Sequence, residues 1–282
     1  MIENNRFLDI LTWVVLAVGI AIIGFPVYVT FVASTLTAQE VLQAPMTLVP
    51  GSHFLDNYRT ALVDGVGESA IPVGKMLLNS LWMALGIALG KILVSILSAF
   101  AIVYFRFPLR KLAFWMIFIT LMLPVEVRIM PTYQIVSDLG LINTRTGMIL
   151  PIIASATATF LFRQFFLTVP EELAEAARVD GAGPMRFFRD VLLPLSMTSI
   201  AALFVIQFIY GWNQYLWPLL VTTNRELAPV VVGVTQMISR SGDAATDWNL
   251  VMATVMLAML RPAAVVVLMQ RWFVKGLVET EK

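Results

Sequence analysis

Six apolar segments constrain this chain more than any other feature of its sequence, because each has about the length that crosses a lipid bilayer. A hydrocarbon core is about 30 Å thick and takes about 20 helical residues to span. The chain is 59% hydrophobic and 13% charged, whereas a soluble domain averages about 45–50% and about 25%. We therefore expect an all-α integral membrane protein, one domain over residues 1–282 with six transmembrane helices. The expected spans are residues 10–33, 77–104, 112–131, 147–167, 195–221 and 250–272.

The third segment is the weakest of the six, because its uncharged run ends near Val125 and the charged Glu126 and Arg128 follow. The first segment is too long for the core of a signal peptide, and no A-x-A cleavage site follows it. Apart from Lys91 and Arg261, which lie deep inside spans, eleven lysines and arginines fall toward one side of the membrane and six toward the other. The richer side is expected to be cytoplasmic, so both termini and the loop over residues 168–194 should be cytoplasmic.

Residue types that commonly carry catalysis are scarce. The chain has no cysteine and one histidine, His53, so neither a thiolate site nor a histidine metal cluster can form. No G-x-x-x-x-G-K-[ST] motif occurs, so the chain has no P-loop to bind ATP. A net charge of +1 supplies no basic face for a nucleic acid. We expect no catalytic residue, metal or cofactor on this chain.

A polar stretch separates the fourth and fifth apolar segments. Thr168 and Glu171 have the spacing of a capping box, and Pro170 suits the first turn of a helix. Gly181 can adopt the left-handed conformation that ends a helix. The stretch is therefore expected to be a short helix outside the bilayer, lying against a partner; an ordinary amphipathic loop helix is the alternative.

A second short helix is expected over residues 184–194. Its apolar side chains have near-helical spacing and can lie against the membrane helices; they are Phe187, Phe188, Val191 and Leu192. On the helix before it, four side chains share one face, and the small ones among them would let a partner approach closely. That face carries Leu173, Ala176, Ala177 and Asp180, with Glu175 beside it.

Two charged residues lie inside apolar segments. Lys91 follows the Gly86-x-x-x-Gly90 pattern that lets helices approach closely, and a packed lysine is as acceptable here as a substrate contact. Arg261 precedes Pro262 near the centre of the sixth segment, where a charge is costly unless paired or hydrated. It could bind a phosphate in a bidentate pair, or it is a change peculiar to this sequence.

The fifth segment contains candidates for a substrate pathway, namely Trp212, Asn213, Gln214 and Tyr215. Amides inside a span need hydrogen-bond partners, and aromatic rings suit a polyol-sized cavity. The aromatic residues could instead belong to an interfacial belt or to a contact between membrane subunits.

The loop motif Glu175-Ala176-Ala177, followed by Asp180-Gly181 and Leu193-Pro194, resembles the EAA loop of ABC importer permeases. Other motifs are similar to those of the carbohydrate-uptake branch of that family, which includes the smaller membrane subunit of the maltose importer. They are Asp56-Asn57-Tyr58, Asn79-Ser80-Leu81, Phe105-Arg106-Phe107-Pro108, Leu139-Gly140-Leu141-Ile142-Asn143-Thr144 and Trp212-Asn213-Gln214-Tyr215-Leu216-Trp217-Pro218. At Arg261 the chain departs from the apolar residue or proline usual in the family.

The resemblance implies a six-helix permease of the bacterial inner membrane whose EAA loop is the coupling helix. The residues implied to contact the ATPase are Leu173, Glu175, Ala176, Ala177, Asp180 and Gly181. The implied partners are a second, homologous permease, a homodimeric P-loop ATPase that holds ATP and Mg, and a periplasmic substrate-binding protein. The implied cargo is sn-glycerol-3-phosphate or a related glycerophospho compound, with a sugar as the alternative.

Two other functional classes compete with this interpretation. A secondary transporter usually relies on acidic or histidine relays inside its spans, but here carboxylates occur only at the margins, as at Glu126. A membrane enzyme would need a nucleophile–base set or a metal cluster, which a chain with one histidine and no cysteine is poorly equipped to form.

Overall fold

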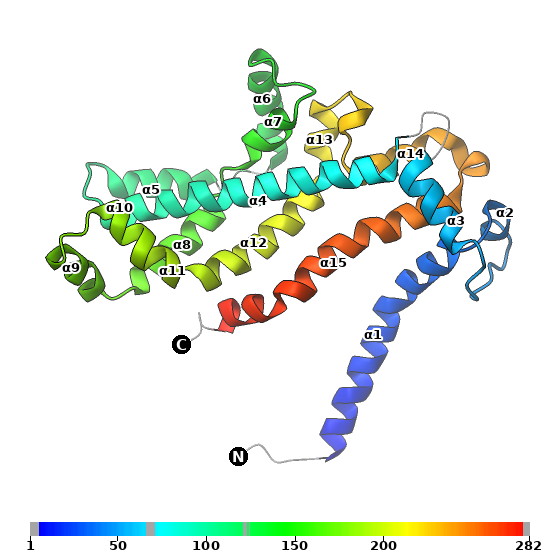
Figure 1. Cartoon of the computed structure of the whole chain (residues 1–282), viewed down its shortest axis with the longest axis horizontal. Coiled ribbons are helices and arrows are strands. Elements are labelled where there is room, and N and C mark those ends of the chain that lie inside the picture. The colour runs from blue at the N-terminus through cyan, green and yellow to red at the C-terminus, as the bar shows by residue number, and fades with distance from the viewer. Residues whose placement is uncertain (1–5, 66–70, 121–122, 124, 279–282) are drawn as a thin grey trace. The chain divides into compact units, whose positions relative to one another are not determined.

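The computed structural model describes residues 6–65, 71–120, 123 and 125–278, and within those ranges every regular element is a helix (Figure 1). The chain forms two compact units. One comprises Met1–Lys75 with Gly233–Leu260, and the other comprises Met76–Val232 with Arg261–Lys282. Two long helices, α4 and α15, and the shorter α14 contribute to both units.

The first unit is built on the long apolar helix α1 and the polar loop that follows it. Its elements are α1 (Arg6–Ser34), α2 (Ala38–Val41), α3 (Phe54–Arg59), the π-helical turn η1 (Thr60–Asp64), most of α14 (Val230–Ala245) and the first part of α15 (Trp248–Val278). Buried Asn57 holds this unit together: its Nδ2 donates to the carbonyl oxygens of Ser34 at 2.9 Å and Leu36 at 2.8 Å. Its Oδ1 accepts a hydrogen bond from Asn249 Nδ2 at 3.0 Å. The side chain therefore joins α1, α3 and α15 within the unit.

The second unit is built around α4 (Val73–Tyr104). The elements that follow it are α5 (Arg110–Ile119), α6 (Val125–Asp138), α7 (Arg145–Ile149), the 3-10 turn η3 (Leu150–Ile152), α8 (Ala156–Thr168), α9 (Glu171–Val179), α10 (Pro184–Phe187), the π-helical turn η4 (Phe188–Leu192), α11 (Leu193–Leu195), α12 (Met197–Trp212), α13 (Leu216–Val221) and the 3-10 turn η5 (Arg225–Leu227). The helices α8 and α12 run along α4 (Figure 1).

Close approach to α4 depends on two of its glycines. A Cβ on Gly90 would lie 2.5 Å from Cγ2 of Ile153, and a Cβ on Gly86 would lie 2.8 Å from Cδ1 of Ile149. A side chain at either position would require Ile149 or Ile153 to shift. The two glycines of the Gly-x-x-x-Gly pattern thus face Ile149 on α7 and Ile153 in the segment before α8 at close range.

By length and composition, three to five segments of the described chain could cross a membrane. Three are single helices: Ile10–Ser34, Val73–Tyr104 and Trp248–Arg271. Two are bent pairs: Arg145–Ile152 with Ala156–Thr168, bent by 48°, and Pro184–Leu195 with Met197–Trp212, bent by 72°.

Several segments expected to be continuous are interrupted. The break in 147–167 has local causes: Pro151 lies in η3, and Ser155 caps α8 by accepting a hydrogen bond from the Ala158 amide at 3.3 Å. The segment 195–221 divides where α12 ends at Trp212 and α13 begins at Leu216. The weak segment 112–131 falls on two helices, α5 and α6, which end and begin on either side of residues 120–124.

Candidate functional site

The helix α9, at one end of the second unit, carries the EAA motif (Figure 1). One side of this helix is buried and the other is exposed. Ala174 is 7% exposed and belongs to the core, whereas Val179 is 88% exposed. Glu175, Ala176 and Asp180 are also exposed, as the sequence predicts. Ala177 is half-buried and packs against the core beside Ala174, so the expected outward face has one member fewer.

The predicted capping box at the start of α9 is wrong. Thr168 is the last residue of α8, and its hydroxyl donates to the carbonyl oxygen of Phe165 at 2.7 Å. Pro170 is the N-cap of α9, not a residue of its first turn. A residue before proline avoids the helical region, and Val169 is accordingly extended, with ψ 125°. This separates Thr168 from the helix that it was expected to cap.

The end of α9 is confirmed as a glycine turn. Gly181 has φ +69°, a left-handed conformation that side chains with a Cβ disfavour. Its amide donates to the carbonyl oxygen of Arg178 at 3.0 Å, and the Ala182 amide donates to that of Ala177 at 2.8 Å. These two bonds form a Schellman motif, which fixes the direction in which the chain leaves α9.

The segment after this turn is anchored in the core of the second unit. Phe187 and Phe188 are 6% and 9% exposed, and Leu192 is fully buried. The Phe188 ring lies 4.9 Å from that of Phe100 on α4, and the Phe187 ring lies 5.3 Å from that of Tyr104. The expected apolar stripe is therefore confirmed, and it connects the loop after α9 directly to the longest helix of the unit.

The break between α12 and α13 contains the other group of predicted site residues. Trp212 is 2% exposed and stacks on Phe208 with ring centroids 5.9 Å apart. Asn213 is exposed, Tyr215 is half-buried, and Gln214 donates from Nε2 to the carbonyl oxygen of Tyr210 at 3.2 Å. Trp212 thus has a packing role, while the three residues after it lie in the irregular segment.

Arg261 is brought to this group from α15. Its guanidinium carbon lies 6.0 Å from the centroid of the Trp212 ring, within the range of a cation–π contact. Its Nη1 is buried, and among the described residues it has no hydrogen-bond partner. A buried guanidinium nitrogen without an acceptor is unusual, and it is a reason to expect an anionic or polar ligand there.

Lys91 has a partner that the sequence does not indicate. The residue is 6% exposed, and its Nζ lies 3.7 Å from the centroid of the Tyr210 ring. A lysine over an aromatic ring is stabilised by a cation–π interaction. Packing therefore accounts for Lys91 without a substrate contact.

Asn143 has a structural role that we did not predict. Its side-chain Oδ1 accepts hydrogen bonds from the backbone amides of Thr223 at 2.7 Å and Asn224 at 2.9 Å. Its backbone amide donates to the carbonyl oxygen of Val221. It has φ +59°, a conformation that asparagine tolerates better than most residues. The Leu-Ile-Asn-Thr run marks Asn143 as a turn residue. Nothing in the sequence indicates that its partner is the loop at Thr223 and Asn224.

No group of three or more histidines, cysteines or carboxylates that could hold a metal ion occurs in the described parts of the chain. The two candidate regions are thus a surface helix anchored to the core by phenylalanines and an irregular helix break beside an unpartnered arginine. Neither arrangement assembles a nucleophile with a base. The surface helix suits contact with another protein, and the helix break suits passage of a solute, better than either suits bond-making chemistry.

Comparison with known proteins agrees with this interpretation. A family described as "binding-protein-dependent transport system inner membrane component" matches residues 91–279. The chain is 64% identical to the sn-glycerol-3-phosphate transport system permease protein UgpE of Pectobacterium atrosepticum and 59% identical to that of Agrobacterium fabrum, in both cases over all of this chain and all of the relative.

Among solved structures, a chain from a bacterial ABC transporter that imports the acidic polysaccharide alginate is similar, with a TM-score of 0.83. The match covers 97% of this chain and 99% of that chain at 20% sequence identity, which establishes the likeness of fold. This chain belongs to the binding-protein-dependent transport system inner membrane components, the non-catalytic permeases of ABC importers.

Proposed function

We propose that this chain is a permease subunit of an ABC importer for sn-glycerol-3-phosphate. The observation that carries the proposal is identity of about 60% over the full length to several permeases named for that cargo. A sugar is the second candidate cargo. A related glycerophospho compound is a further candidate, because it also presents a phosphate that the transporter could recognise.

A binding-protein-dependent system requires an ATPase and a substrate-binding protein besides its membrane component. The full assembly that we propose has this chain, a second homologous permease and two copies of a P-loop ATPase, which holds ATP and Mg. A periplasmic protein delivers the cargo. The permease has six spans: the three single helices, the two bent pairs, and a sixth formed by α5 and α6. Both termini lie in the cytoplasm of a bacterial cell.

The face of α9 is the proposed contact with the ATPase. Its residues are Leu173, Glu175, Ala176, Ala177, Asp180 and Gly181. The exposed side chains make the contact, while half-buried Ala177 and the turn at Gly181 hold the helix in position. Movement of α9 then reaches α4 through Phe188 and its ring contact with Phe100.

The proposed substrate pathway runs past the helix break and Arg261. Asn213, Gln214 and Tyr215 supply polar atoms, and Trp212 supports them by packing and contacts Arg261. A guanidinium recognises phosphate through two parallel hydrogen bonds, and the unpartnered Nη1 of Arg261 is a donor suited to it. Lysine at this position would keep the charge and lose the bidentate geometry.

Uptake by the reconstituted importer tests the proposal. The four-part membrane complex in proteoliposomes, with its binding protein outside and ATP inside, should accumulate glycerol-3-phosphate and not maltose. Arg261→Ala should lower uptake of glycerol-3-phosphate more than Arg261→Lys does. Uptake of maltose alone would overturn the proposed cargo, and unchanged uptake in Arg261→Ala would remove Arg261 from the pathway.

A further inference from the structure

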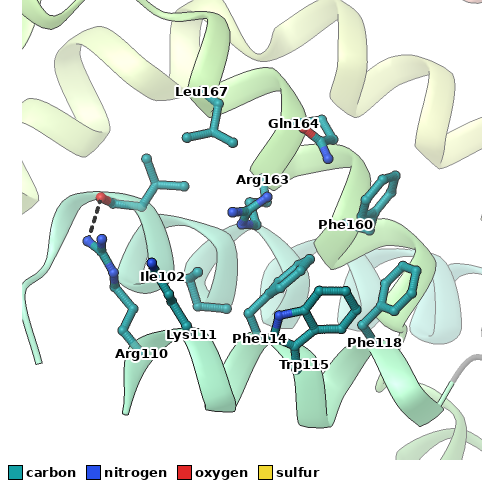
Figure 2. Close-up of a pocket in the computed structure, with 11 residues that line it drawn as sticks. Ile102, Arg110, Lys111, Phe114, Trp115, Phe118, Phe160, Arg163, Gln164 and Leu167 are labelled. Carbon is teal, nitrogen blue, oxygen red and sulfur yellow. Dashed lines mark hydrogen bonds between the residues drawn. The ribbon is translucent and has the colours of Figure 1, made fainter. Parts of the chain in front are cut away.

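A cavity of about 400 Å³ lies in the second unit, between the last turns of α4, the start of α5, and α8 (Figure 2). Three cationic residues line it, Arg110, Lys111 and Arg163, and its lining contains no carboxylate. Figure 2 shows Arg110 and Lys111 toward one end of the cavity, Arg163 near its middle beside Phe114, and Phe118 and Phe160 at the other end. The cavity is therefore cationic at one end and aromatic at the other.

Among the described residues, no carboxylate forms an ion pair with the cations of this cavity. Arg110 donates to two backbone carbonyl oxygens, those of Val103 at 3.5 Å and Phe105 at 3.3 Å. The Arg163 guanidinium lies over the Phe114 ring, 4.2 Å from its centroid. Its Nε is buried, and within the described ranges it has no hydrogen-bond partner.

The position of the cations on α5 adds a second reason to expect an anion. Arg110 and Lys111 are the first two residues of that helix, where the helix dipole favours negative charge and disfavours cations. The N-cap, Leu109, has no side chain that could accept a hydrogen bond from the first amides. A bound anion would satisfy the helix end and the arginines together.

The apolar lining of the cavity indicates which kind of anion fits. Trp115 and Leu167 line the cavity and are 55% and 54% exposed, so apolar surface continues outward from the cations. A free phosphate would leave that surface uncovered, whereas a phospholipid would cover it with its glycerol and acyl chains. Basic pockets between helices near the cytoplasmic membrane surface are typical sites for anionic head groups.

We infer that this cavity binds the phosphate of an anionic phospholipid in the cytoplasmic leaflet. The inference rests on the proposed function for the orientation of the chain, and it concerns a site separate from the substrate pathway. The lipid phosphate lies between Arg163 and the start of α5, and its acyl chains lie along Trp115 and Phe118. The lipid thereby joins α5 to α8 at the membrane surface.

Native mass spectrometry of the purified importer complex tests this inference. Delipidated complex is titrated with phosphatidylglycerol or with phosphatidylcholine, and bound lipid is counted. We expect preferential binding of phosphatidylglycerol and a loss of affinity of about fivefold in Arg163→Gln, the equivalent of about 1 kcal/mol for one cation. Arg163→Lys should retain most of the affinity. Lys111→Gln, at an exposed position, should show a similar loss without removing the contact with Phe114.

The matched control is Arg106→Gln, because Arg106 is an exposed cation four residues from Arg110 that does not line the cavity. Equal binding of the two lipids, or equal losses in Arg106→Gln and Arg163→Gln, would overturn the inference. Displacement of the lipid by millimolar inorganic phosphate would assign the site to a free anion and would also overturn it. Normal glycerol-3-phosphate uptake alongside any of these results would leave the proposed function intact.

Discussion

Replacement of Gly181 by valine should weaken the coupling of ATP hydrolysis to transport. The cost comes from the backbone alone: Gly181 has φ +69°, and a Cβ there would meet nothing within 4 Å. Holding an L-residue in the left-handed region costs about 1–2 kcal/mol, a factor of about 5–30 in the population of the native turn. If the chain relaxes instead, it loses the Schellman bonds from the amides of Gly181 and Ala182.

The assay is the number of glycerol-3-phosphate molecules transported per ATP hydrolysed by the reconstituted complex. Gly181→Val should lower this ratio while ATP hydrolysis continues. Gly183→Val is the matched control, because Gly183 has φ −70° and also has open space around it. A wild-type ratio in Gly181→Val would contradict the role of this turn in coupling. Equal losses in both variants would mean that added bulk on this surface matters and the turn geometry does not.

Three further substitutions test packing, buried hydrogen bonds and pH dependence. Gly90→Val should lower the free energy of unfolding by about 1–3 kcal/mol, because it overpacks against Ile153. The melting temperature of the complex should fall, and it should recover in part when Ile153→Ala is added. An unchanged melting temperature would contradict this packing. Asn57→Ala should destabilise the protein by about 1–3 kcal/mol, because it leaves two buried carbonyl oxygens without a donor. An unchanged melting temperature would contradict the role of that side chain. Hydrogen bonds from the Thr37 amide and hydroxyl lower the pKa of Glu40, so its carboxylate stabilises the fold at neutral pH and this contribution is lost as pH falls through the lowered pKa. The difference in melting temperature between wild type and Glu40→Gln should therefore narrow in acid, and a constant difference would contradict the pKa shift.

The sequence predicts best what depends on local chemistry. Apolar length predicts the helices α1, α4 and α15, and the polar stretch after residue 168 predicts a helix with Gly181 at its end. The same reasoning failed at Thr168, since an extended Val169–Pro170 step separates it from α9. A capping box does occur elsewhere, where Thr37 and Glu40 satisfy each other at the start of α2.

What the sequence leaves open depends on contacts between distant segments. The Lys91–Tyr210 pair joins residues on α4 and α12, and neither residue type implies the other. Likewise, Asn143 binds a loop about 80 residues further along the chain. The cavity beside Arg163 exists because α5 and α8 are adjacent, which the apolar pattern of each helix does not specify.

Site-specific cross-linking from α9 tests whether this helix is the surface through which the ATPase acts. The chain has no cysteine, so Ala176→Cys introduces a unique attachment point for a photoactivatable maleimide on the exposed face of α9. In the assembled importer this probe should cross-link to the ATPase subunit, while the same probe at Leu48→Cys, in the loop after α2, should not. Absence of that product from Ala176→Cys in a complex that still transports, or an ATPase cross-link from Leu48→Cys alone, would contradict the proposed role of α9.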